Sequence, residues 1–267
     1  MTNSRDLSTL ILLLKLLQRK RKRPCSPEPC CCCPCSEPPS PGPTPTPQPI
    51  YREITIPVPQ PEGITDLPAN IYFQLDRRFN SAQEQRIKDA INGVLFHWFT
   101  HHNEKWNGGA NNGTSQLAAC TNTYAIRNLQ PVWYQGPSIS NGLEATNLAM
   151  NQFTQLIRDN GFRLSSPAKI DYRIPSPVTS SSILGETAFR QKQIPLSFTI
   201  NPTFLDNIAV NTTRLTGSML HAWLHRAGFY DPKVTSYFIA ECPMCVMRGF
   251  QPKNPAIPDS FFYISFD

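Results

Sequence analysis

Apolar residues recur with characteristic spacings from residue 67 onward, and these spacings predict the secondary structure of a folded domain. Residues 69–76 (ANIYFQLD) mix aromatic and branched side chains, which is typical of a strand. In the next segment, residues 81–102, apolar side chains recur every three to four positions and predict a long first helix. Ser81 and Glu84 have the spacing of a capping box at the start of that helix.

Three later segments are also rich in branched and aromatic residues, and we expect each to supply strands. They are residues 123–136, 169–175 and 193–202. Residues 107–116, which are rich in glycine and asparagine, predict a loop after the first helix.

Two further helices are expected among these strands. Residues 147–161 have helical spacing and end in an Asn-Gly pair, which favours a helix end. Asn211 is expected to cap a helix over residues 212–227, because its side chain can accept from the first free N–H groups. Gly228 then ends this helix, since glycine tolerates positive φ. This order of elements predicts the α+β class, with a twisted mixed sheet covered by helices.

Composition divides the chain into three parts. The chain has 267 residues and 27 prolines, many of which crowd the first seventy positions. Residues 24–66 alternate proline with small polar residues, so we expect a disordered, semi-rigid linker in extended polyproline geometry. Residues 67–267 then form one folded domain, whose roughly 200 residues are enough for a single core.

Residues 1–23 hold a short apolar run followed by basic residues. The apolar part, residues 7–17, is interrupted by Lys15 and is shorter than the roughly 20 residues that a membrane span needs. Its positive charges follow the apolar run, which does not fit a secretory signal. We expect peripheral membrane contact through this segment, and the alternative is a short helix that packs on protein or frays. The basic run at residues 19–23 also supplies much of the net charge of +6, so we expect no nucleic-acid partner.

The nine cysteines fall into two groups. Six lie within residues 25–35, and three, Cys120, Cys242 and Cys245, lie in the folded domain. The odd total leaves at least one thiol without an internal partner, and we expect a reducing, cytoplasmic compartment, with membrane association through residues 1–23. For the linker cysteines, acylation, binding of soft metals and no role at all stay open.

Candidate metal ligands lie on the last predicted helix and just beyond it, in the sequence HAWLHRAGFYD. His221 and His225 are four residues apart and therefore lie on one helix face, where both imidazoles can reach one ion. A sharp turn at Gly228 can bring Asp231 back as a third, oxygen ligand. Three protein ligands leave a fourth position open, as in reactive zinc sites. The alternative is a buried helix whose histidines are satisfied by hydrogen bonds alone.

This segment resembles the signature H-E-x-x-H-x-x-G-x-x-H of the metzincin family of zinc metallopeptidases, in a variant that ends in aspartate. The resemblance implies a metzincin-like domain in which His221, His225 and Asp231 hold Zn²⁺. It also implies a methionine-bearing turn beneath the metal, for which Met247 within residues 241–250 is the best candidate.

The departure from the family is Ala222, which stands where metzincins carry the glutamate that acts as general base. An alanine methyl group cannot take or give a proton, and loss of a general base costs on the order of 10²–10⁴ in rate. The resemblance therefore implies a zinc-binding pseudopeptidase that holds a peptide or protein segment in its cleft. One alternative is an active zinc endopeptidase with a non-standard base, for which Glu241 is a candidate. The other is a metal-free structural or interaction domain.

A second set of residues also has the spacing of zinc ligands. Cys242 and Cys245 form C-x-x-C, and His97 and His101 form H-x-x-x-H on the first helix. Together they would make a structural Cys₂His₂ site that is closed to water. The simpler alternatives are a Cys242–Cys245 disulfide or two inert thiols.

Overall fold

The structure is a computed structural model that describes residues 50–109, 113–177, 181, 184 and 194–266. The expectations for residues 1–23, for the linker up to residue 49 and for the linker cysteines fall outside these residues. Within the described part of the chain, no helix has both the length and the apolar character needed to cross a membrane.

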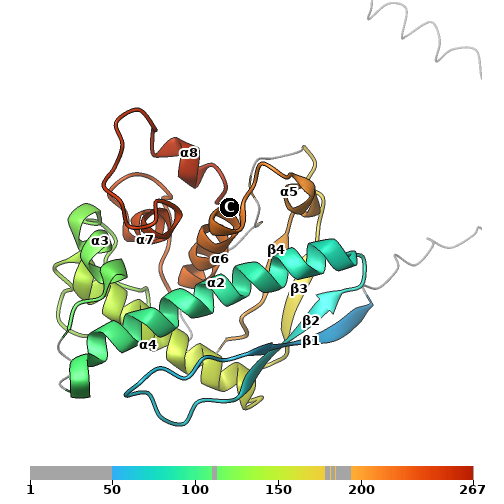
Figure 1. Cartoon of the computed structure of the whole chain (residues 1–267), viewed down its shortest axis with the longest axis horizontal. Coiled ribbons are helices and arrows are strands. Elements are labelled where there is room, and N and C mark those ends of the chain that lie inside the picture. Colours follow the sequence, from blue (N-terminus) through green and yellow to red (C-terminus); the bar gives the residue numbers. More distant parts are fainter. Residues whose placement is uncertain (1–49, 110–112, 178–180, 182–183, 185–193, 267) are drawn as a thin grey trace, which may run out of the picture. The chain divides into compact units, whose positions relative to one another are not determined.

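Strands and helices follow one another along the described residues as Figure 1 shows. The strands are β1 (Tyr51–Pro57), β2 (Asn70–Asp76), β3 (Ala168–Tyr172) and β4 (Phe198–Ile200). The helices are α2 (Ser81–Trp106), the 3-10 helix η1 (Asn107–Gly109), α3 (Gln116–Tyr124), α4 (Gly142–Gly161), α5 (Pro202–Asp206), α6 (Thr212–Arg226), α7 (Phe238–Met247) and α8 (Ser260–Tyr263).

The four strands form one mixed sheet in the order β1-β2-β3-β4. β1 runs antiparallel to β2, with Ile54 opposite Phe73, whereas β2, β3 and β4 run parallel to one another. Along β2, Ile71, Phe73 and Leu75 are buried and the residues between them are partly exposed. This alternation is what a sheet with one covered face requires, because successive side chains point to opposite faces. The predicted α+β class and mixed sheet are confirmed.

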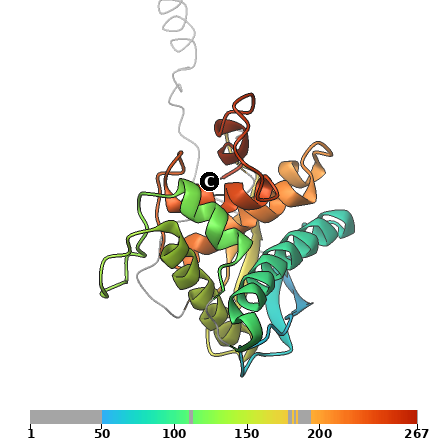
Figure 2. The same ribbon diagram turned by 60° about the vertical axis from the view of Figure 1, so that its left-hand side comes forward.

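Helix α2 buries a stripe of apolar side chains and makes the close contact that positions α6. The stripe is at most 1% exposed and consists of Ile87, Ala90, Ile91, Val94, Leu95 and Trp98. At Gly93, an added methyl group would stand 2.2 Å from the hydroxyl oxygen of Thr216 in α6. The missing side chain at Gly93 therefore lets α2 and α6 cross closely, as both views show (Figures 1 and 2).

Local capping signals place α6 where the sequence predicts it. The side chain of Asn211 accepts a hydrogen bond from the backbone N–H of Arg214 at 2.9 Å. Gly228 follows the end of the helix with a φ of +96°, in the left-handed region. For α2 the capping box lies one residue earlier than predicted, because Asn80 is the cap and Gln83 completes the pair.

Strand β1 corrects the predicted domain boundary. It occupies Tyr51–Pro57, inside the segment predicted to be a disordered linker, so the folded domain begins near residue 50 rather than 67. Ile54 and Ile56 are buried in the core. β1 lies at the edge of the sheet, where proline is tolerated, and this explains why a proline-rich composition concealed a strand.

The strands expected at residues 123–136 are not formed. This segment holds the end of α3 and a loop, in which an isolated bridge pairs Arg127 with Tyr237. Pro131 cannot donate to a strand ladder, and Trp133 instead donates its indole N–H to the carbonyl of Ala227 at 2.8 Å. Trp133, one of the aromatic residues that suggested strands, therefore packs at the end of α6.

A disulfide joins α3 to α7 through Cys120 and Cys245, whose Cα atoms are 6.0 Å apart. Cys242 is a buried free thiol, and burial raises its pKa to about 12. Cys245 is bonded to Cys120, so it is available neither for a disulfide with Cys242 nor as a free thiol or zinc ligand. The three predictions for Cys242 and Cys245, which were a shared disulfide, two inert thiols and a Cys₂His₂ zinc site, are therefore wrong. The cytoplasmic location expected from the cysteine count stays a prediction.

Replacing both Cys120 and Cys245 with serine is expected to lower the free energy of unfolding by about 2–5 kcal/mol, because the bond closes a long loop in the unfolded chain. The sequence separation of 125 residues places it at the upper end of loop lengths. Urea denaturation of the two proteins measures the difference. A reductant should weaken the wild-type protein and leave the double variant unchanged. A wild-type protein that is equally stable with and without reductant would contradict the prediction.

Two adjacent histidines near the end of α2 are buried and engaged with hydroxyl groups. His101 Nδ1 lies 2.7 Å from Ser115 Oγ, and His102 Nε2 lies 3.2 Å from Thr154 Oγ1. Burial lowers the pKa of His101 to about 3 and the pKa of His102 to about 4. Desolvation favours the neutral imidazole, so both rings stay uncharged in the folded protein at neutral pH.

These two histidines should make the protein less stable in mild acid. Both folded pKa values lie below the ordinary value of 6.5, so unfolding takes up protons between pH 6.5 and about 4. The stabilisation that comes from keeping the two rings uncharged is therefore fully present above pH 6.5. The free energy of unfolding falls as the pH drops below this value, by roughly 1.4 kcal/mol per pH unit for each imidazole. Urea denaturation at pH 7, 6 and 5 measures the slope. The variant His101→Gln should show a slope smaller by roughly 1.4 kcal/mol per pH unit, because one proton fewer is taken up on unfolding. An unchanged slope would refute the assignment.

Candidate metal centre

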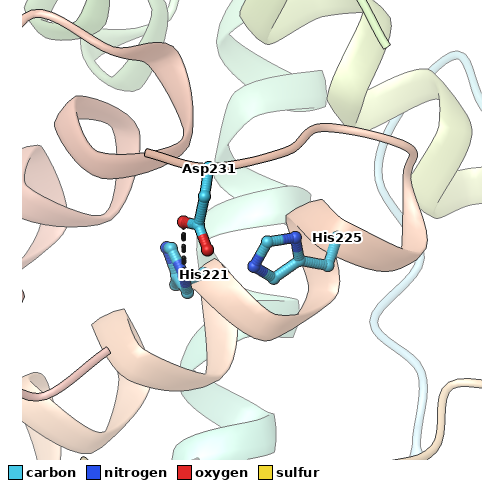
Figure 3. Close-up of side chains that lie close together, drawn as sticks. All are labelled: His221, His225 and Asp231. Atoms are coloured by element: carbon cyan, nitrogen blue, oxygen red, sulfur yellow. Dashed lines mark ion pairs between the residues drawn. The ribbon is translucent and has the colours of Figure 1, made fainter. Parts of the chain in front are cut away.

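Helix α6 presents His221 and His225 one turn apart on the same side. Their ring centroids are 4.9 Å apart and the ring planes are nearly perpendicular, at 87°. Both side chains are at most 1% exposed, so the helix holds them inside the protein rather than on its surface. Figure 3 shows the two rings turned toward the same space.

Backbone carbonyl groups fix the orientation of both rings. His221 Nδ1 lies 2.9 Å from the oxygen of Ile239 in α7, and His225 Nδ1 lies 2.9 Å from the oxygen of Phe229. A carbonyl oxygen can only accept, so each Nδ1 carries the hydrogen and the neutral ring keeps its lone pair on Nε2. Metal-binding histidines are held in this way, with the second ring nitrogen donating to a carbonyl or carboxylate oxygen.

The turn after α6 brings the third candidate ligand over the two histidines. Gly228 adopts its positive φ here, and a methyl group at this position would lie 2.4 Å from the indole nitrogen of Trp133. Glycine is therefore required both by the backbone conformation and by the adjacent indole. The turn places the Phe229 carbonyl against His225 and carries the chain on to Asp231.

Asp231 completes the cluster that the sequence predicts. Its Oδ1 atom lies 3.9 Å from Nε2 of His221, and the ligand atoms of His221, His225 and Asp231 all lie within 4.8 Å of one another (Figure 3). Ligand atoms in a tetrahedral zinc site stand roughly 3.3–3.4 Å apart. The cluster is therefore a candidate metal-binding triad, and its His221–Asp231 pair stands farther apart than two ligand atoms of a zinc site do.

Ala222 follows the first histidine and is fully buried. Its methyl group offers no atom that can accept or donate a proton. Glu241, the alternative base considered from the sequence, is also fully buried but belongs to a different set of contacts. Its carboxylate accepts from Lys253 Nζ at 2.7 Å and from the backbone N–H of Ser236 at 2.9 Å. These bonds make Glu241 a counter-ion that fixes the start of α7, and they give no support to it as a base.

The prediction of a methionine-bearing turn at residues 241–250 is wrong. These residues form most of α7 and the end that follows it, and Met247 is the last residue of the helix. Its side chain packs on Gly217 of α6, where an added methyl group would stand 2.5 Å from Met247 Cε. Met247 therefore helps to hold α7 against α6, one helical turn before His221.

Three contributors to the site have no signal in the sequence. Ile239 acts through its backbone oxygen, which any residue type would supply. Trp133 comes from a loop that is distant in the sequence. Phe266 stacks on His221, with ring centroids 4.4 Å apart and an angle of 10° between the planes. None of these contacts follows from residue spacing, because each depends on how separate segments pack.

The open side of the cluster is that of Asp231. Its side chain is 46% exposed, whereas His221 and His225 are covered. A cavity of about 310 Å³ borders the same loop and is lined by Ile126, Asn128, Leu129, Gln130, Ile139 and Tyr230. Asn128 also donates to the Asp231 carbonyl at 3.4 Å. A ligand that reaches the cluster from solvent would therefore pass Asp231 first.

Comparison with known proteins leaves the resemblance resting on the signature alone. No family model matches the chain, and no curated protein or solved structure shows significant similarity to it. The resemblance to metzincins therefore stays a prediction from the sequence of residues 221–231.

One divalent ion should bind to this cluster, and the affinity should depend on each ligand. The variant His225→Ala is expected to lose binding by more than about 100-fold, since removing a ligand costs more than removing a residue that merely orients one. Calorimetric titration of the full chain with zinc measures this loss. His97→Ala is the matched control, because His97 lies on α2 outside the cluster, and it should bind as the wild type does. Equal stoichiometry and affinity in His225→Ala and wild type would rule out the cluster as the site.

Proposed function

We propose that this domain binds zinc through His221, His225 and Asp231 and holds a peptide or protein segment without cutting it. The observation that carries the proposal is the geometry of the two imidazoles, each with Nδ1 on a backbone carbonyl and Nε2 in the cluster with Asp231. Two imidazoles and one carboxylate form a donor set that suits zinc. The metzincin resemblance of the same residues supports this choice of metal.

Zinc bound at this position would supply a Lewis acid able to polarise a carbonyl group. The residues of the chain orient the ligands: Ile239 and Phe229 fix the ring tautomers, and Gly228 allows the turn that carries Asp231. None of these groups can move a proton to or from a reacting atom. With Ala222 in the general-base position, we infer binding of a peptide segment rather than hydrolysis.

The exposed side of the cluster supports a peptide as the bound ligand. The cavity beside Asp231 combines apolar side chains from Ile126, Leu129 and Ile139 with amide groups from Asn128 and Gln130. Apolar surface with a few polar groups is the usual lining of a site that binds an organic ligand. A peptide offers both an apolar side chain and backbone groups to such a site.

The variant Ala222→Glu restores a carboxylate at the general-base position. It distinguishes a metallopeptidase site that lacks only its base from a domain that cannot hydrolyse peptides for other reasons. The wild-type protein should show no chelator-sensitive digestion of casein, and Ala222→Glu should gain on the order of 10² or more in rate. Ala222→Gln is the matched control, because it adds the same bulk at a buried position without a proton acceptor, and it should stay silent. Chelator-sensitive digestion by the wild type that His221→Ala abolishes would instead support an active endopeptidase.

A further inference from the structure

The last described residues of the chain lie on the candidate metal centre. Phe266 is fully buried, and its ring lies face to face with the imidazole of His221, at 4.4 Å between centroids and 10° between planes. A stacked aromatic ring excludes water from the face that it covers. Figures 1 and 2 show the segment after α8 returning to the flank of α6.

Polar side chains around the site hold the backbone next to this ring. Lys233, two residues after Asp231, donates to the Phe266 carbonyl at 2.9 Å. Arg214 and Ser218 of α6 bond to the hydroxyl and carbonyl groups of Ser265, at 2.5 and 3.3 Å. The attachment therefore comes from α6 and from the loop that carries the third ligand, which are the two parts that build the centre.

The Phe266 ring also packs against α7, and we call the position that it occupies between α7 and His221 its seat. Phe266 packs with Ala240 and Met244 in a small apolar cluster that is separate from the main core. By contrast, none of the residues of the short helix α8, Ser260–Tyr263, is buried, and Phe261 is 53% exposed. The segment is therefore anchored most firmly at its end, while Phe262 and Tyr263 pack against the same cluster with partly exposed side chains. A segment with few fully buried side chains opens more easily than the whole protein unfolds.

We propose that residues 260–266 form a strap that covers the His221 side of the metal centre, with Phe266 in a seat that recognises an aromatic side chain. This inference rests on the proposed function. The seat lies between His221 and Met244, and a peptide bound across the centre would place an aromatic side chain there. The strap is the intramolecular version of that ligand, and it competes with peptides from solution.

The strap should lower the apparent affinity for an external peptide by the fraction of time that it is closed. The probe is a fluorescent peptide with the chain's own terminal sequence, PDSFFYISFD. The full-length variant Phe266→Ala should bind it about tenfold or more tightly than the wild-type protein does, as measured by fluorescence anisotropy. Ile208→Ala is the control, since it removes an apolar side chain that is 97% exposed and lies outside the strap, and it should behave as wild type. A peptide with alanine in place of the Phe266 residue should not bind.

A folded Phe266→Ala variant that gains no affinity for the peptide would overturn the strap. If that variant fails to fold by circular dichroism, Lys233→Met decides in its place, because it removes the bond to the Phe266 carbonyl and keeps the buried ring. It should show a smaller gain in the same direction, and no gain would overturn the strap. The assay is run with zinc and with chelator. Absence of zinc binding in every protein contradicts the proposed function, while the peptide affinities still decide the strap.

Discussion

Helix α7 carries the carbonyl oxygen of Ile239 to within 2.9 Å of His221 Nδ1, and the orientation of this first histidine depends on the contact between α6 and α7. Met247 packs directly on Gly217, whose missing side chain lets the two helices approach closely. The disulfide to Cys120 holds α7 from its other side. A hydrogen bond that fixes one ring tautomer is thus maintained by side chains that have no part in binding.

The turn after α6 plays the corresponding role for the second histidine. Its carbonyl at Phe229 orients His225, and the same few residues carry Asp231 to the cluster. Helix, turn and third ligand are consecutive in the chain, so half of the site is built by local geometry. The other half comes from α7 and from the C-terminal segment, which reach the site only in the folded protein.

The site combines covered nitrogen ligands with an exposed oxygen ligand. Burial of His221 and His225 excludes water from the imidazoles, whereas solvent screens the charge of the Asp231 carboxylate. The exposed Asp231 leaves one approach to the cluster. Ala222, which follows His221, is fully buried and offers no proton acceptor.

The sequence by itself determined α6, its cap at Asn211, its end at Gly228 and the convergence of three ligand residues, because these depend on spacing and backbone preference within some twenty positions. It also determined the long helix α2 and the strand β2, whose apolar periods are strong. Tertiary structure decided the rest. β1 lies in a proline-rich part of the sequence and forms a strand by pairing with β2, and the bond between Cys120 and Cys245 joins residues that no local pattern relates. Phe266 reached His221 for the same reason: contacts between distant segments follow from how the core packs, and residue spacing does not encode them.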